Sequence, residues 1–154
     1  MIAIPTLRTY FVEDNPTIRD NLIATLEELA GVTALGYAET EQQGSVWLTG
    51  KAAEAAAPNP PPMDTVADTP VDPLINPDWD LAIIDLFLKQ GSGLGVLQAC
   101  RQRAARQKMV VLSNYATPDI RARCLQLGAD AVFDKSQDID ALIAFCQALI
   151  VGKA

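Results

Sequence analysis

The chain of 154 residues contains no histidine. This absence excludes catalytic dyads and triads that use an imidazole base, and it excludes metal sites with histidine ligands. It equally excludes a chain that carries a phosphoryl group on its own histidine. Any bound metal ion must therefore be held mainly by oxygen, which favours magnesium, manganese or calcium.

Cysteines and long apolar runs are also scarce. The three cysteines, Cys100, Cys124 and Cys146, are odd in number and lack the spacing of metal ligands, so we expect buried, free thiols. No apolar run approaches the roughly 18 residues of a membrane helix. The N-terminal residues lack the features of a secretory signal, and we expect a cytoplasmic protein.

The net charge of −7 argues against direct binding of nucleic acid. Apolar residues make up 49% of the chain, which is enough for a sizeable core in one domain of this length.

Short apolar runs alternate with segments of helical periodicity, which predicts an α/β fold with a parallel sheet covered on both faces. The expected strands are 7–12, 32–38, 80–85, 109–113 and 131–133. The expected helices run from 16 to a stop at 31, from 41 to about 56, from 94 to 104, from 118 to 127, and from 139 to 150. These elements account for the chain, so we expect one domain over residues 1–154 without an effector domain.

A proline-rich stretch at about 57–78 interrupts this alternation between the second helix and the third strand. Proline cannot continue a helix or donate to a central strand. We therefore expect an extended insertion on the surface.

Four of the predicted strands run into reactive polar residues. Glu13 and Asp14 follow the first strand, Asp85 ends the third, Ser113 ends the fourth, and Lys135 follows the fifth. The carboxyl ends of parallel strands meet at one edge of a sheet, where ligands bind. Carboxylates, a hydroxyl and an ammonium gathered there suit a divalent cation beside a phosphoryl group.

Four sequence segments carry a family resemblance: Val12-Glu13-Asp14-Asn15, Asp85 to Leu94, Val111-Leu112-Ser113, and Gly128 to Ser136. With them the chain resembles a receiver domain of a two-component response regulator, from about Leu7 to Ile150 apart from the insertion. The resemblance implies a flavodoxin-like (βα)5 three-layer sandwich with strand order 2-1-3-4-5.

The resemblance also implies roles for these residues. Asp85 would be the phosphoacceptor, and Ser113 and Lys135 would assist catalysis. Asp14, with Glu13, Asp85 and the backbone carbonyl of Phe87, would hold Mg²⁺, with Mn²⁺ as a possible substitute. The phosphoryl donor would be a phosphohistidine of a sensor histidine kinase or phosphotransfer protein, or a small acyl phosphate.

The chain departs from the family pattern near the site. Lys89 and Ser136 stand where the family often has proline, and Val132 stands where it usually has an aromatic switch residue. Phe133 follows, but successive strand residues face opposite sides of a sheet, so it cannot simply replace an aromatic at Val132. We expect Leu86, Asn114 and Tyr115 to flank the pocket or take part in the switch with these two residues.

These features favour a single-domain response regulator that signals through protein contacts. A homodimer could form through the fourth helix, fifth strand and fifth helix. The alternatives are an interaction module that works without phosphorylation, and a phosphorelay shuttle or sink. A hydrolytic phosphatase is disfavoured, since Phe87 stands where its acidic residue would be. We further expect Phe87 and Tyr115 to shield an aspartyl phosphate from water.

Overall fold

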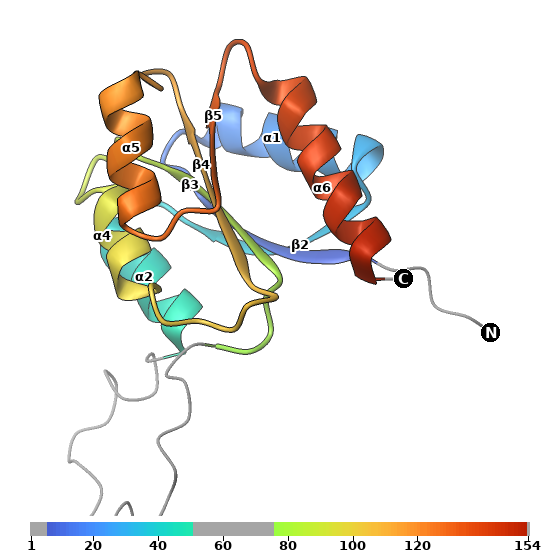
Figure 1. Ribbon diagram of the computed structural model, residues 1–154, viewed down its shortest axis with the longest axis horizontal. Coiled ribbons are helices and arrows are strands. Elements are labelled where there is room, and N and C mark those ends of the chain that lie inside the picture. Colours follow the sequence, from blue (N-terminus) through green and yellow to red (C-terminus); the bar gives the residue numbers. More distant parts are fainter. Residues whose placement is uncertain (1–5, 51–75, 154) are drawn as a thin grey trace, which may run out of the picture.

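The computed structural model describes residues 6–50 and 76–153. Within these ranges, five strands alternate with five helices (Figure 1). The strands are β1 (Leu7–Val12), β2 (Val32–Ala38), β3 (Leu81–Asp85), β4 (Lys108–Ser113) and β5 (Ala131–Asp134). The helices are α1 (Pro16–Leu29), α2 (Glu41–Thr49), α4 (Gly93–Ala99), α5 (Pro118–Gln126) and α6 (Ile139–Lys153).

The strands form one parallel sheet in the order β2-β1-β3-β4-β5, which confirms the predicted flavodoxin-like fold. All residues of β3 are buried, as expected for a strand at the centre of a sheet with both faces covered. The edge strand β2 is buried only at its two ends, and its inner positions alternate between exposed and partly buried. Because the strands are parallel, the polar residues at the carboxyl ends of β1, β3, β4 and β5 lie at one edge of the sheet.

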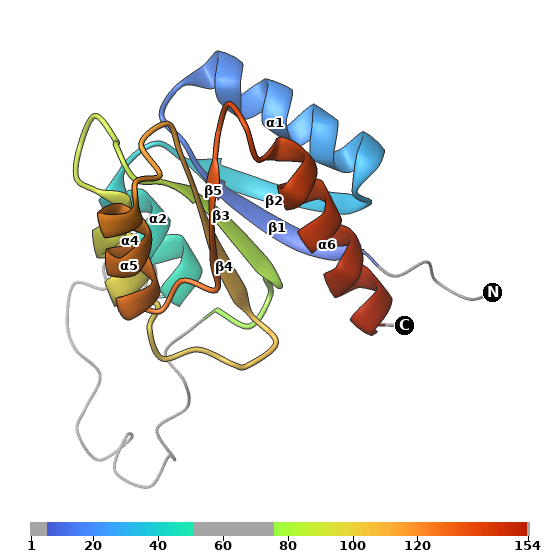
Figure 2. The ribbon, with the colours of Figure 1, turned by 45° about the horizontal axis from the view of Figure 1, so that its top comes forward.

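Helices α1 and α6 cover one face of the sheet, and α2, α4 and α5 cover the other (Figure 2). Each face has its own apolar core. Phe11, Leu26 and Leu142 lie in the core beneath α1 and α6. Val12 and Leu97 lie in the opposite core. Neighbouring residues of β1 thus face opposite layers, as the two-residue period of a strand requires.

Local capping chemistry sets the start of α1. The Asn15 side chain accepts a hydrogen bond from the Ile18 amide at 3.0 Å, and Pro16 occupies the first turn. This agrees with the predicted cap, because the free amides of a first turn need acceptors and proline has no amide hydrogen to satisfy.

The predicted end of the second helix at about residue 56 is wrong. Helix α2 ends at Thr49, because Gly50 adopts the left-handed conformation with φ +75° and its amide bonds back into the last turn. Glycine takes this conformation without steric cost and commonly ends helices in this way.

Helix α4 is also shorter than predicted. It ends at Ala99, and Ala104 is exposed in the following turns rather than on the inner face of the helix. The guanidinium of Arg103 explains this end, since it donates hydrogen bonds to the carbonyls of Cys100, Gln107 and Gly128. These bonds stabilise the turn in place of another turn of helix.

Most of the predicted proline-rich insertion at about 57–78 lies outside the described residues, which resume at residue 76. The prediction for the cysteines is confirmed: all three are buried and free. Burial raises the pKa of the Cys100 and Cys146 thiols to about 12. Among the described helices, none is long and apolar enough to cross a bilayer.

The segment before β3 is tied to the end of α2. The indole of the fully buried Trp79 donates a hydrogen bond to the Leu48 carbonyl at 2.9 Å. The backbone amide of Asn76 donates to the same carbonyl at 3.0 Å, and the side-chain amide of Asn76 donates to the Trp47 carbonyl. The end of α2 is therefore fixed relative to the start of β3.

Replacing Trp79 with phenylalanine should lower the free energy of unfolding by about 2 kcal/mol, since it leaves a cavity and removes a buried hydrogen bond. Trp47 provides a matched control: it is only partly buried and stacks on Tyr10, so phenylalanine can keep the stacking. Denaturant unfolding of W79F and W47F measures both effects. An equal loss in the two variants would contradict this account of Trp79.

Candidate functional site

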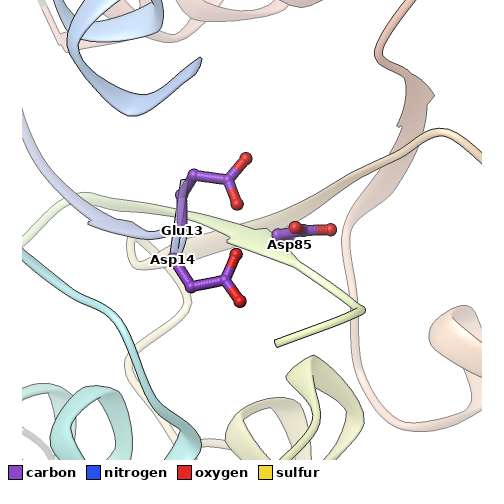
Figure 3. Close-up of side chains that lie close together, drawn as sticks. All are labelled: Glu13, Asp14 and Asp85. Carbon is purple, nitrogen blue, oxygen red and sulfur yellow. The ribbon is translucent and has the colours of Figure 1, made fainter. Parts of the chain in front are cut away.

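Three carboxylates meet at the carboxyl edge of the sheet. Glu13 and Asp14 directly follow β1, and Asp85 is the last residue of the neighbouring strand β3. One carboxylate oxygen from each residue lies within 4.8 Å of the others. Figure 3 shows the Glu13 and Asp14 carboxylates pointing from the end of β1 toward Asp85. The predicted acidic cluster therefore forms.

The ammonium of Lys135 lies between two of these carboxylates. Its Nζ is 2.6 Å from Glu13 Oε1 and 3.1 Å from Asp85 Oδ2. The three side chains are only 11%, 4% and 9% exposed, respectively, for Lys135, Glu13 and Asp85. Burial by itself would lower the pKa of Lys135, but the hydrogen bond to Glu13 and the charge of Asp85 outweigh burial and raise that pKa. The lysine is thus held as a cation.

Glu13 is the most buried member of the cluster. Burial raises the pKa of its carboxyl, the neighbouring Asp85 raises it further, and Lys135 partly offsets both. Within the described ranges, Glu13 Oε2 is buried without a hydrogen-bond partner. A buried, unpaired carboxylate oxygen is costly unless a cation or donor satisfies it. An all-oxygen cluster with such an atom fits a hard divalent cation, so the cluster could hold a metal ion.

The loop after β3 contacts the carboxylates of Asp85 and Asp14. The Phe87 amide donates to Asp85 Oδ1 at 3.3 Å, and the Lys89 amide donates to Asp14 Oδ2 at 2.6 Å. The Asp14 carboxylate is therefore shared between the acidic cluster and the loop. The buried Leu86 anchors the start of this loop in the core.

Ser113 is the last residue of β4 and is fully buried. In the parallel register Asp85 pairs with Leu112, so Ser113 lies one residue past the partner of Asp85 on the adjacent strand. Its Oγ accepts a hydrogen bond from the Tyr115 amide at 3.0 Å. Ser113 thus joins the same edge of the sheet as the acidic cluster.

Two aromatic rings lie beside this edge. Phe87 and Tyr115 are 55% and 63% exposed, and their rings meet edge to face with centroids 5.4 Å apart. This contact joins the loop after Asp85 to the loop after Ser113. Asn114 is exposed and lines a separate cavity of about 380 Å³ between α1 and the segment after β5, together with Lys135.

The two predicted switch positions on β5 face opposite layers, as expected. Val132 is 8% exposed in the core shared with α5, whereas Phe133 packs in the other core. The Phe133 ring contacts Phe145 of α6 edge to face at 5.7 Å. Phe133 therefore does not take the position that Val132 occupies.

Sequence reasoning missed Glu41, the first residue of α2. Its carboxylate accepts a hydrogen bond from the Ser92 amide at 2.8 Å, in the loop that follows Asp85. The only sequence signal for this contact is a pair of glycines, Gly91 and Gly95, which leave room for the carboxylate.

Comparison with known sequences gives a family match and two partial relatives. Residues 68–147, just over half of the chain, match the model of the response regulator receiver domain. The acid tolerance regulatory protein ActR of Rhizobium meliloti (strain 1021) is 38% identical over 63 residues, as is ActR of Sinorhizobium medicae (strain WSM419). Each match covers 41% of this chain and 32% of the relative, so the chain spans about a third of these curated relatives.

Solved structures agree on the fold. The receiver domain of Francisella response regulator 1452 is 16% identical with a TM-score of 0.68, and the match covers 97% of this chain and 100% of that one. A CheY-like receiver domain protein from Methanospirillum hungatei JF-1 is 20% identical with a TM-score of 0.67, covering 96% and 95% of the two chains. The fold, the acidic cluster and the family match agree, and the chain belongs to the response regulator receiver domain family.

Proposed function

We propose that this chain is a phosphorylatable response regulator in which Asp85 accepts a phosphoryl group. The observation that carries the proposal is the position of the Lys135 ammonium, which bonds to both Glu13 and Asp85 at the edge of the sheet. A fixed cation beside a carboxylate nucleophile serves phosphoryl transfer, which depends on positioning and charge neutralisation.

The donor is the phosphohistidine of a sensor histidine kinase or phosphotransfer protein, or a small acyl phosphate. Receiver domains generally have a histidine kinase as partner. A carboxylate oxygen of Asp85 bonds to phosphorus while the bond from phosphorus to the donor breaks. The electron pair of that bond returns to the imidazole nitrogen of a phosphohistidine, or to the carboxylate oxygen of an acyl phosphate. Lys135 offsets the negative charge of the phosphoryl oxygens, and the Ser113 hydroxyl donates a hydrogen bond to one of them.

Mg²⁺, with Mn²⁺ as a substitute, is the proposed metal. Asp14, Glu13, Asp85 and the backbone carbonyl of Phe87 would hold it, since all supply the oxygen ligands that these ions prefer. When bound, the ion would neutralise the carboxylates and the incoming phosphoryl oxygens. Asp14 also keeps its hydrogen bond from the Lys89 amide, which holds the loop beside the cluster.

Phosphorylated Asp85 carries close to two negative charges where the free carboxylate carries one, which favours a state with Ser113 drawn toward the site. The signal then leaves through the face formed by α5, β5 and α6, to a protein partner or to a second copy of the chain. A relay role, in which Asp85 passes the group onward or acts as a sink, uses the same chemistry. The alternative, a module that works without phosphorylation, is favoured only by Val132 in place of a switch aromatic.

Phosphotransfer tests the proposal. In the presence of Mg²⁺, histidine kinases from the same source that carry a radiolabelled phosphohistidine, or radiolabelled acetyl phosphate, should label the wild-type chain. The Asp85→Asn substitution should abolish labelling, because the carboxylate nucleophile is lost. Beryllofluoride, which mimics the phosphoryl group, should shift NMR signals of α5 in the wild-type chain only. Binding without such shifts would favour the phosphorylation-independent module, and labelling of the Asp85→Asn variant would contradict the assignment.

Replacing Lys135 with methionine should destabilise the fold by about 3 kcal/mol near pH 8, because two buried carboxylates lose their countercharge. This loss of stability should become smaller as the pH falls toward 5. Without Lys135 the already raised pKa of Glu13 rises further, so the folded state binds a proton that the unfolded chain does not. Stability then falls as the pH rises through this window.

Chemical denaturation of K135M and wild type at pH 5 and pH 8 measures this difference. Lys89→Met removes the same charge from an exposed side chain nearby and serves as the matched control. A K135M deficit that is independent of pH would contradict the proposed coupling between Lys135 and Glu13.

Phe87 and Tyr115 should prolong the lifetime of the aspartyl phosphate, because their rings lie in contact and restrict the approach of water to the site. Phe87→Asn and Tyr115→Glu should each raise the rate of phosphate loss several-fold without changing the site of labelling. Following the decay of the labelled protein after removal of the donor measures these rates. Unchanged rates in both variants would refute the shielding role.

A further inference from the structure

The loop between β3 and α4 is held by carboxylates from two other parts of the chain. On one side the Lys89 amide donates to Asp14, as described above. On the other side the Ser92 amide donates to Glu41 Oε1 at 2.8 Å. The Glu41 amide in turn donates to the Gln90 carbonyl at 3.1 Å. The loop and the first turn of α2 are thus bonded to each other in both directions.

The Glu41 side chain fits against two glycines. A Cβ added at Gly91 would lie 2.3 Å from the Glu41 Cβ, and a Cβ added at Gly95 would lie 2.3 Å from the Glu41 Cδ. Real Cβ atoms do not approach other heavy atoms so closely. Gly91 also has φ +86°, which disfavours other residues there. Gly95 has no left-handed backbone, and the atoms nearest to an added Cβ there all belong to the Glu41 carboxylate, so glycine at this position leaves space for that carboxylate.

The contact between Glu41 and Ser92 is connected to Asp85 through the backbone of Phe87. Ser92, the residue bonded to Glu41, forms an isolated antiparallel bridge with Phe87. The Phe87 amide then donates to Asp85 Oδ1. Ser92 also caps α4, since its side chain accepts from the Leu94 amide. A displaced Ser92 would therefore disturb the backbone that lies against Asp85.

The helix that carries Glu41 is well placed to serve as an anchor. Its last turn is bonded to Asn76 and Trp79, which precede β3, and its first turn is bonded to the loop after β3. Both ends of α2 are therefore fixed relative to the strand that ends at Asp85. A carboxylate on such a helix can hold a loop in one position.

We propose that Glu41 is a positioning residue, which holds the Phe87 backbone in register with Asp85 through the Ser92 amide. This inference rests on the proposed function of Asp85 and adds a residue outside the acidic cluster. Glu41 contributes no atom to the phosphoryl transfer. It acts by fixing the Phe87 amide beside Asp85 and the Phe87 carbonyl proposed as a metal ligand.

Three substitutions separate the effect of the length of the Glu41 side chain from the effect of its charge. Glu41→Gln keeps a side-chain oxygen at the same distance from the backbone and loses the charge. Glu41→Asp keeps the charge, and any favourable interaction with the helix N-terminus, but is one methylene too short to reach Ser92. Glu41→Ala removes both. Gln42→Ala, at the exposed neighbouring position of α2, is the control.

The first measurement is amide hydrogen exchange by NMR in the metal-free protein. Exchange of the Phe87 and Ser92 amides should accelerate by about fivefold in E41A and E41D, the factor that corresponds to one net hydrogen bond. It should stay near wild type in Q42A, and in E41Q it should lie between wild type and E41A, because a neutral amide oxygen accepts more weakly than a carboxylate. Amides of Val110 and Val111 in β4 should not change, because the loss is confined to the loop. Mg²⁺ affinity should fall in E41A and E41D in parallel.

Gly95→Ala gives a second, independent test. Alanine is a better helix former than glycine, and no left-handed backbone is needed at this position. Its methyl group should nevertheless displace the flexible Glu41 carboxylate and reproduce the effect of E41A on the Phe87 amide. In the double variant E41A/G95A the methyl group meets no carboxylate, so G95A should add nothing to E41A.

Unchanged Phe87 exchange in E41A would overturn the inference, as would equal acceleration of the Val110 and Val111 amides, which indicates general destabilisation. An E41Q variant as impaired as E41A would overturn it too. The outcome is separable from the proposed function. If the wild-type chain accepts no phosphoryl group, the proposed function fails, while exchange at Phe87 still decides the role of Glu41.

Discussion

The Lys135 ammonium between Glu13 and Asp85 is the interaction on which the site depends. It joins the ends of β1 and β3 to the segment after β5, three elements that are far apart in the sequence. Two carboxylates this close and this buried repel each other and lose hydration, so the fold needs a cation between them. The parallel sheet supplies it, because strand order and register bring all three residues to one edge. The proposed phosphoryl transfer and the local stability of this edge therefore depend on the same charge.

The sheet alone does not complete the site, since the residues that follow Asp85 lie in a loop. That loop is held by side-chain carboxylates rather than by regular secondary structure: Asp14 accepts from the Lys89 amide and Glu41 from the Ser92 amide. Charged acceptors make stronger hydrogen bonds to backbone amides than neutral ones. Asp14 belongs to the acidic cluster as well, so the position of the loop and the charge of the cluster are physically linked.

The parallel sheet and the acidic cluster were predictable from the sequence, because apolar strands alternate with helices and polar residues stand at the ends of the strands. The strand order followed only from the resemblance to receiver domains. The end of α2 was harder: helical composition continues past Thr49, and the stop depends on the backbone conformation of Gly50. The end of α4 depends on hydrogen bonds of Arg103 to carbonyls up to 25 residues away. Glu41 was not predictable for the same reason, since its partner Ser92 lies 51 residues along the chain.

Alternation in β5 leaves the face toward α5 without an aromatic side chain from this strand. Phe133 faces α6 and packs on Phe145, so β5 presents the smaller Val132 to the layer that contains α5. The aromatic contact beside the site comes instead from Phe87 and Tyr115, one from each loop. A serine hydroxyl can donate one hydrogen bond while it accepts another. Under the proposed function, Ser113 donates to a phosphoryl oxygen and still accepts from the Tyr115 amide. Any displacement of the Ser113 hydroxyl would then be passed to Tyr115, and through its ring to the loop that contains Phe87.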